Sequence, residues 1–258
     1  MITFTLNNEK EFYTGDPNSS LLDFLRLDKH ITSVKDGCSA QAACGACTVE
    51  INGKAMLSCV VKMSKLQDAV INTPEGFPPY VLDTIAKAMV NKGAVQCGFC
   101  TPGFISRTKV LLQDNPSPTI EEIQKAIKPH ICRCTGYKKI EEAIQYAGET
   151  ICKNEKLEIR STSGKVGESH PKYDAYNTAI GARDFVDDIY IEGMLFGALK
   201  FSDHPRAKII KIDTSKASNY QGVKRVFTAK DIPGEQKVGL IIQDWPVMIA
   251  EGETTNFI

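Results

Sequence analysis

The chain has 258 residues, which exceeds the usual size of one compact domain and favours two or three domains with separate cores. Basic and acidic residues number 31 each, so no positive surplus favours nucleic acid or an anionic membrane surface. No run of about eighteen apolar residues occurs, so we expect no membrane span and a cytoplasmic location. Residues 1–7 alternate apolar and polar side chains, as a strand does and a secretory leader does not. Nine cysteines in a reducing compartment favour metal ligation, catalysis or core packing over disulfides.

The first 60 residues predict strands and one short helix. Period-two patterning predicts a strand pair over residues 2–6 and 11–14, and Ser19 and Ser20 are placed to cap a short helix after it. Asn52 and Gly53 suit a type I′ hairpin turn because both residue types accept a positive φ. The hairpin strands are expected at residues 47–51 and 55–59.

Beyond Pro79 the apolar residues recur at helical spacing. Residues 81–89 and 104–112 predict two helices, Thr119 opens a third with a capping box, and residues 140–146 supply the apolar face of a fourth. Four helices therefore fit residues 80–152.

A charged segment with few large apolar residues, 154–174, has the composition of an exposed linker. After it, short β-rich runs alternate with turn signals and predict a third unit that mixes helix and strand. The strands are expected at residues 194–199, 209–212 and 223–227.

Eight of the nine cysteines fall into two sets of four. The first set lies in a loop and a returning hairpin strand, with small residues between the thiols that let backbone N–H groups point at sulfur. Five residues separate its first two cysteines where plant-type ferredoxins have four, so the loop must absorb one extra residue for Cys38 to serve as a ligand. The set is Cys38, Cys44, Cys47 and Cys59.

The second set consists of two close pairs, each placed ahead of an expected helix. A position at a helix N-terminus favours the thiolate because the helix dipole is positive there. Pro102, just after the first pair, suits the first turn of a helix. The set is Cys97, Cys100, Cys132 and Cys134.

The cysteine spacing is also compatible with roles that involve no iron. Two cysteine pairs satisfy a tetrahedral structural zinc ion as well, which would make the chain a binding module. A thioredoxin-like role for Cys97 and Cys100 would need a βαβ context, and the predicted context is helical. Cys152 stands outside both sets and is interpreted as a small buried hydrophobe.

Three motifs resemble the iron-sulfur part of the xanthine dehydrogenase and aldehyde oxidoreductase family. They are Cys-Gly-Ala-Cys at 44–47, Gln-Cys-Gly-Phe-Cys-Thr-Pro-Gly at 96–103 and Cys-Arg-Cys-Thr-Gly-Tyr at 132–137. The resemblance implies an α+β multidomain chain with a β-grasp ferredoxin-like domain over 1–76 and a four-helix domain over 77–153. Each domain would bind one 2Fe-2S cluster through one cysteine set.

In this family the helical-domain cluster lies next to the molybdopterin and the ferredoxin-like cluster lies farther out. The resemblance therefore implies that electrons leave molybdenum through the second cysteine set first. By motif position, Gln96 and Cys134 look like residues that touch the pterin, although Gln96 also suits a polar helix surface.

The resemblance continues after the linker into 175–258, which looks like the incomplete start of the a/b hammerhead domain of the molybdenum-binding subunit. The matching segments are 181–189, 193–199, 202–207, 212–215 and 222–234. His204 lies in one of them without ligand-spaced partners and is interpreted as structural.

The family's molybdopterin-binding segments and catalytic glutamate match nothing in this chain. We therefore expect an oxidoreductase component that has no catalytic residue of its own for hydroxylation. Its expected role is to relay electrons between a molybdenum-binding polypeptide and an FAD-binding subunit or another acceptor. A nonfunctional remnant of a longer enzyme is the remaining alternative, and neither the substrate nor the final acceptor follows from the sequence.

Overall fold

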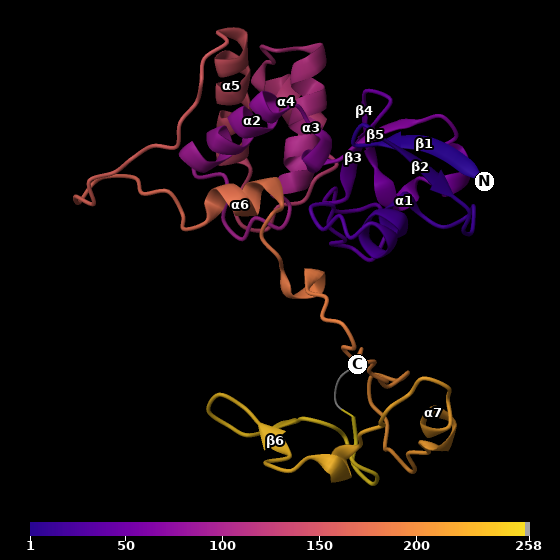
Figure 1. The fold of residues 1–258 in the computed structure, drawn as a ribbon. Coiled ribbons are helices and arrows are strands. Elements are labelled where there is room, and N and C mark those ends of the chain that lie inside the picture. Colours follow the sequence, from indigo (N-terminus) through magenta and orange to yellow (C-terminus); the bar gives the residue numbers. More distant parts are fainter. Residues whose placement is uncertain (256–258) are drawn as a thin grey trace. The chain divides into compact units, whose positions relative to one another are not determined.

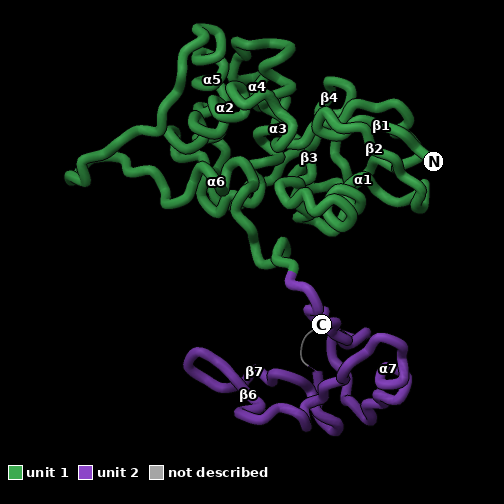
Figure 2. The backbone as a smooth tube through the Cα atoms, in the orientation of Figure 1, with its two compact units in different colours: residues 1–190 green, residues 191–258 purple. Residues whose placement is uncertain are grey.

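The computed structural model describes residues 1–255, which divide after residue 190 into two compact units (Figure 2). The first unit contains a sheet lobe and a helical lobe, in which α3 lies beside β3 (Figure 1). The second unit begins at residue 191.

The sheet lobe is built on five strands in the order β2-β1-β5-β3-β4. β1 pairs with β5 in parallel, and the other neighbours are antiparallel. Asn7, Asn8, Asn52 and Gly53 all have positive φ, so each hairpin turn uses residue types that accept that conformation. Both predicted hairpins are confirmed, but Cys59, expected on the returning strand of the second, lies just after it in a 3-10 turn. The strands are β1 Ile2–Leu6, β2 Glu9–Tyr13, β3 Thr48–Ile51, β4 Lys54–Leu57 and β5 Val70–Asn72.

A short helix, α1 Leu21–Asp23, packs its apolar side against the sheet and continues as the π-helical turn η1 Phe24–Asp28. The predicted cap is confirmed and is Ser20 of the two expected serines, because the Asp23 N–H donates to Ser20 Oγ at 3.0 Å. The rings of Phe4 and Phe24 meet edge-on with centroids 5.5 Å apart inside the core. Three 3-10 turns complete the lobe: η2 Ser58–Val60, η3 Met63–Lys65 and η4 Pro74–Gly76.

The helical lobe contains the four predicted helices around one apolar core. The capping box before the third of them is confirmed: Thr119 Oγ1 accepts the Glu122 N–H at 3.3 Å, and the Glu122 carboxylate accepts the Thr119 N–H at 2.8 Å. Phe104, Ile105 and Ile144 are among the fully buried core side chains. The helices are α2 Pro79–Asn91, α3 Thr101–Asp114, α4 Ile120–Ile127 and α5 Lys138–Cys152.

The two lobes of this unit are joined through buried contacts between α3 and β3. Lys109 Nζ lies 2.6 Å from a carboxylate oxygen of Glu50, and the two side chains are only 13% and 5% exposed. Where the lobes meet, a Cβ on Gly103 would lie 2.7 Å from the carbonyl oxygen of Gly45. Glycine is required there because the two backbones touch.

After α5 the chain is extended and mostly exposed up to α6 Ala175–Ile180. Leu157 is the exception: it is buried, and Asn91 on α2 holds this stretch by donating to the Glu158 carbonyl at 2.8 Å. α6 then packs Ala175 and Ala179 into the core of the helical lobe. The 3-10 turn η5 Val186–Asp188 ends the ordered elements of the first unit.

The second unit has little regular structure among its described residues. The strands expected at 194–199, 209–212 and 223–227 are wrong, because these runs are not assigned to any strand. A strand needs a continuous hydrogen-bonded neighbour, and among the described residues only Ile209 of these runs makes backbone hydrogen bonds to a distant segment, at Gly252 and Glu253, beside an isolated bridge between Lys208 and Thr254. The assigned elements are α7 Ser215–Ser218, η6 Ala229–Asp231, β6 Lys237–Val238 and β7 Trp245–Pro246.

Candidate iron-sulfur centres

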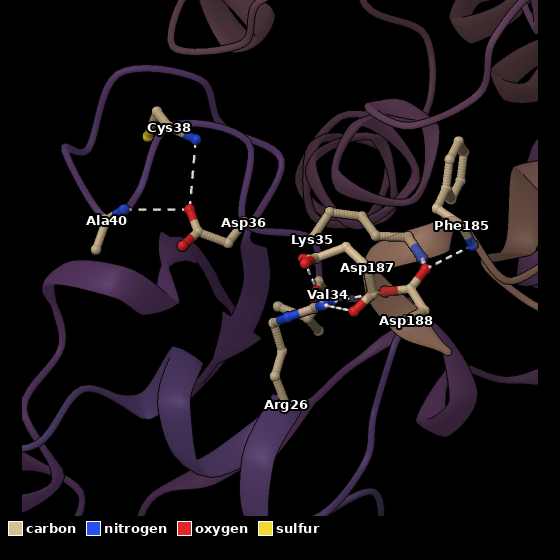
Figure 3. Close-up of polar contacts among 9 residues, drawn as sticks. All are labelled: Arg26, Val34, Lys35, Asp36, Cys38, Ala40, Phe185, Asp187 and Asp188. Atoms are coloured by element: carbon tan, nitrogen blue, oxygen red, sulfur yellow. Dashed lines mark hydrogen bonds and ion pairs between the residues drawn. The ribbon is translucent and has the colours of Figure 1, made fainter. Parts of the chain in front are cut away.

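The first cysteine loop turns back on itself through residues that have left-handed backbone conformations. Ser39, Ala40 and Ala42 have φ of 50°, 58° and 58°, and Gly45 has φ of 73°. Asp36 fixes the start of the loop, since its carboxylate accepts the N–H groups of Cys38 at 3.3 Å and Ala40 at 3.1 Å (Figure 3). The tight turns accommodate the extra residue between the first two cysteines.

The four thiols of this loop come together as two pairs. Cys38 lies beside Cys44, and Cys47 beside Cys59. Burial raises the pKa of Cys59 to about 12, and the neighbouring Cys47 thiol adds to this rise. Burial also acts to raise the pKa of the Cys38 thiol. Hydrogen bonds from backbone N–H groups of the loop outweigh burial, so this pKa is lowered.

Backbone N–H groups converge on the sulfur atoms as a thiolate-bound cluster requires. Such hydrogen bonds stabilise negative charge on sulfur and are one of the factors that set a cluster's potential. The donors are Gln41, Ala43 and Cys44 toward Cys38, Gly37 and Ala46 toward Cys44, and Ala42 toward Cys59. The loop therefore fits a 2Fe-2S cluster held by four thiolates.

The second set lies where α3 begins and in the loop before α5. Its thiols also approach in pairs, Cys97 with Cys134 and Cys100 with Cys132. Burial raises the pKa of the Cys100 thiol above its ordinary range. Burial likewise acts upward on Cys132, but hydrogen bonds from Thr135, whose hydroxyl lies 3.1 Å from the Cys132 sulfur, leave its pKa lowered.

The expected place of these thiols at helix ends holds for Cys100 alone. It is the residue immediately before α3, which starts at Thr101. Cys132 and Cys134 precede α5 by several residues, because α5 starts only at Lys138 after the turn at Gly136 and Tyr137, both of which have positive φ. The helix dipole therefore acts on one thiol of the set instead of four.

The pairwise arrangement bears on the choice between a cluster and a zinc ion. A zinc site gathers four ligands around one ion, whereas a 2Fe-2S cluster offers two irons with two thiolates each. The thiol pairs match the two-iron geometry.

The two sets differ in exposure. Cys97 and Cys134 of the second set are exposed, as is the adjacent Gln96, whereas the four thiols of the first set are all buried or half-buried. The second set thus has an edge that faces outward. Cys152 belongs to neither set, and the expectation that it is buried is wrong: it is exposed at the end of α5, with its sulfur 3.6 Å from the Pro116 carbonyl oxygen.

Sequence reasoning missed several residues that hold the second set in place. His130 is 2% exposed, and its ring lies 4.7 Å from that of Phe104. Burial, aided by the charge of Arg107, lowers the pKa of His130 to about 3. Tyr137 Oη accepts the Cys132 N–H at 3.0 Å and donates to the His130 carbonyl at 3.2 Å. Tyr137 lies inside the motif at 132–137, so its place in that motif was the one sequence signal for such a role.

Three family models match the chain in sequence order. The 2Fe-2S iron-sulfur cluster binding domain matches residues 4–69, the [2Fe-2S] binding domain matches 73–145, and the a/b hammerhead domain of aldehyde oxidase and xanthine dehydrogenase matches 180–256. The chain therefore contains two 2Fe-2S-binding domains followed by the hammerhead segment.

Curated relatives agree with this order. The chain is 45% identical over 152 residues to the nicotinate dehydrogenase small FeS subunit of Eubacterium barkeri, a match that covers 57% of this chain and 94% of the relative. The chain belongs to the molybdenum hydroxylase family of the xanthine dehydrogenase and aldehyde oxidoreductase type. It is an iron-sulfur electron-transfer component of that family, as expected.

Longer family members match nearly all of the chain. The aldehyde oxidoreductase of Megalodesulfovibrio gigas is 36% identical over 250 residues, which are 92% of this chain. The solved aldehyde oxidoreductase from Desulfovibrio desulfuricans superposes with a TM-score of 0.88 at 33% identity over 98% of this chain. The chain spans 28% of the length of the first protein and 30% of the second. No helix among the described residues is long and apolar enough to cross a membrane.

Proposed function

We propose that this chain relays electrons through two 2Fe-2S clusters. Cys38, Cys44, Cys47 and Cys59 hold one cluster in a ferredoxin-like domain over 1–76, and Cys97, Cys100, Cys132 and Cys134 hold the other in a helical domain over 77–153. The pairwise approach of the thiols in both sets is the observation that carries this assignment. A linker over 154–174 then leads to the start of the hammerhead domain, 175–258.

The helical domain receives the electrons first in this proposal. Its outward edge supports this order, because Gln96, Cys97 and Cys134 are exposed and can meet a molybdopterin held by another polypeptide. Each cluster, when bound, supplies a one-electron carrier. Between the two cysteine sets, the Ile131 N–H donates to the Cys44 carbonyl at 2.9 Å, so residues adjoining Cys132 contact a ligand of the other set directly.

The proposal includes a molybdenum-binding polypeptide as partner and an FAD-binding subunit as electron acceptor, both in the cytoplasm. Relatives that are named small subunits support a partner chain. In the second unit, Leu195, Phe196 and Ile241 are 67%, 82% and 96% exposed, which suits a surface that another protein covers. This chain supplies no catalytic residue for hydroxylation.

Metal analysis of anaerobically purified protein tests the cluster assignment. We expect about four irons and four acid-labile sulfides per chain, with visible absorption that bleaches on reduction by dithionite. Cys44→Ser and Cys100→Ser should each remove the signal of one cluster, while the matched control Cys152→Ser keeps both. Zinc without sulfide would establish the zinc-stabilised module instead.

Recovery of the protein from its native host tests the partner. We expect molybdenum to co-purify with the chain and its clusters to be reduced when substrates of the associated enzyme are added. A chain that carries both clusters but recovers no molybdenum would support the alternative of a nonfunctional remnant.

A further inference from the structure

Residues 181–188 contact the second cysteine loop and residues that precede the first. The backbone at Gly181 abuts Ser33, since a Cβ on this glycine would lie 2.5 Å from the Ser33 Cβ. The ring of Phe185 meets that of Phe99, between Cys97 and Cys100, edge-on with centroids 5.2 Å apart. Phe99 in turn lies against Gly37, where a Cβ would be 3.1 Å from its ring. One segment thus touches the supports of both centres.

Asp188 is the charged centre of this contact. Its carboxylate forms ion pairs with Lys35 and, at 3.0 Å, with Arg26 Nη1, and it accepts the Phe185 N–H at 2.9 Å (Figure 3). The side chains of Asp188 and Lys35 are each 1% exposed, and that of Arg26 is 13% exposed. Asp187 also reaches Arg26, at 3.3 Å, but its side chain is 81% exposed.

The two cations that pair with Asp188 lie at the base of the first cysteine loop. Lys35 is three residues before Cys38, and its backbone N–H donates to the carbonyl of Ala46, between Cys44 and Cys47, at 3.4 Å. Arg26 Nη1 donates to the Val34 carbonyl at 2.9 Å. Charges removed from water are poorly screened, so they act on a nearby redox centre much more strongly than exposed charges do.

The ionised form of Asp188 is the one that this geometry favours. Burial acts to raise its pKa, but the hydrogen bonds and charges of Lys35 and Arg26, with the Phe185 N–H, outweigh burial and lower it. Exposed Asp187 is surrounded by water, which screens its charge. Asp188 is therefore the buried negative charge that offsets one of the two positive charges of Lys35 and Arg26.

We propose that Asp188 is a positioning residue for the first centre, offsetting one of the two positive charges of Lys35 and Arg26 beside its loop and so keeping its reduction potential low. The proposal rests on the assignment of a 2Fe-2S cluster to Cys38, Cys44, Cys47 and Cys59. Reduction adds negative charge to a cluster, and uncompensated positive charge nearby favours the reduced state. Without Asp188 the first centre becomes easier to reduce.

The test compares four variants of the whole chain by redox titration. Electron paramagnetic resonance monitors the reduction of each cluster during the titration. Asp188→Asn should raise the potential of the first centre, Lys35→Gln should lower it, and the double variant should lie between them. Asp187→Asn is the matched control and should leave the potential unchanged, because its charge is already screened.

Opposite shifts of the reduction potential in Asp188→Asn and Lys35→Gln are the decisive result. If the ion pair had only a structural role, both variants would shift the potential in the same direction. Shifts of the same sign, or none, with both clusters present would overturn the role of Asp188 and leave the proposed function standing. Loss of all iron from unsubstituted protein would instead remove the proposed function. If Asp188→Asn fails to fold, the comparison of Lys35→Gln with the double variant still gives the sign of the Asp188 effect.

Discussion

Replacing Gly98 with alanine tests whether α6 is held tightly against the loop of Cys97 and Cys100. Gly98 has φ of +83°, and a Cβ there would lie 1.9 Å from the Thr178 Cγ2 of α6. A left-handed conformation costs an L-residue about 1–2 kcal/mol, and the overlap with a buried methyl group adds about 1–3 kcal/mol. We expect Gly98→Ala to lower the free energy of unfolding by about 2–5 kcal/mol.

Two further variants separate the cost of the left-handed conformation from the cost of the steric overlap. Thr178→Ser removes the overlapping methyl group but keeps the hydroxyl that donates to the Asp174 carbonyl at 2.7 Å. In the Thr178→Ser background, Gly98→Ala should cost only the conformational part, about 1–2 kcal/mol. Gly93→Ala should cost the same amount, because Gly93 has φ of +70° and no atom lies within 4 Å of its Cβ position.

Urea unfolding of each variant gives the free energies, and hydrogen exchange of the α6 amides shows whether the helix stays docked. An equal cost of Gly98→Ala in both backgrounds would refute the reasoning, because it would mean that the Thr178 methyl group does not press on the loop. A cost at Gly98 no larger than that at Gly93 would have the same meaning.

Three further results are expected. Glu50→Gln should destabilise the protein by about 3–5 kcal/mol in urea unfolding, because it leaves Lys109 charged and nearly buried; a change under about 1 kcal/mol would show that the pair is effectively solvated. The pKa of Asp188 in the folded protein is below the ordinary 3.8, so its contribution to stability is present above pH 3.8 and is lost as the pH falls through the lowered folded pKa. Measuring the free energy of unfolding at decreasing pH should show this loss of stability. The Asp188→Asn variant should not show it. Thr119→Ala should cost about 1 kcal/mol through the α4 capping box without changing the iron content, and a loss of iron would contradict a purely local role.

Local chemistry explains why much of the fold could be predicted. Asn52 and Gly53 form the hairpin turn because both residue types accept a positive φ, whatever the rest of the chain does. Thr119 caps α4 through atoms three residues away. The same reasoning failed for residues 194–199, because a β-rich pattern becomes a strand only when a neighbouring strand accepts its hydrogen bonds.

The sequence by itself determined the two sets of four cysteines, since ligand type and close spacing are written in the chain. Only the tertiary structure decided which thiols pair, because Cys100 and Cys132 meet through the packing of separate helices. It alone also revealed Asp188, which pairs with Lys35 across 153 residues of sequence. An ion pair between distant residues has no local pattern, so it follows from the folded chain and not from any segment of it.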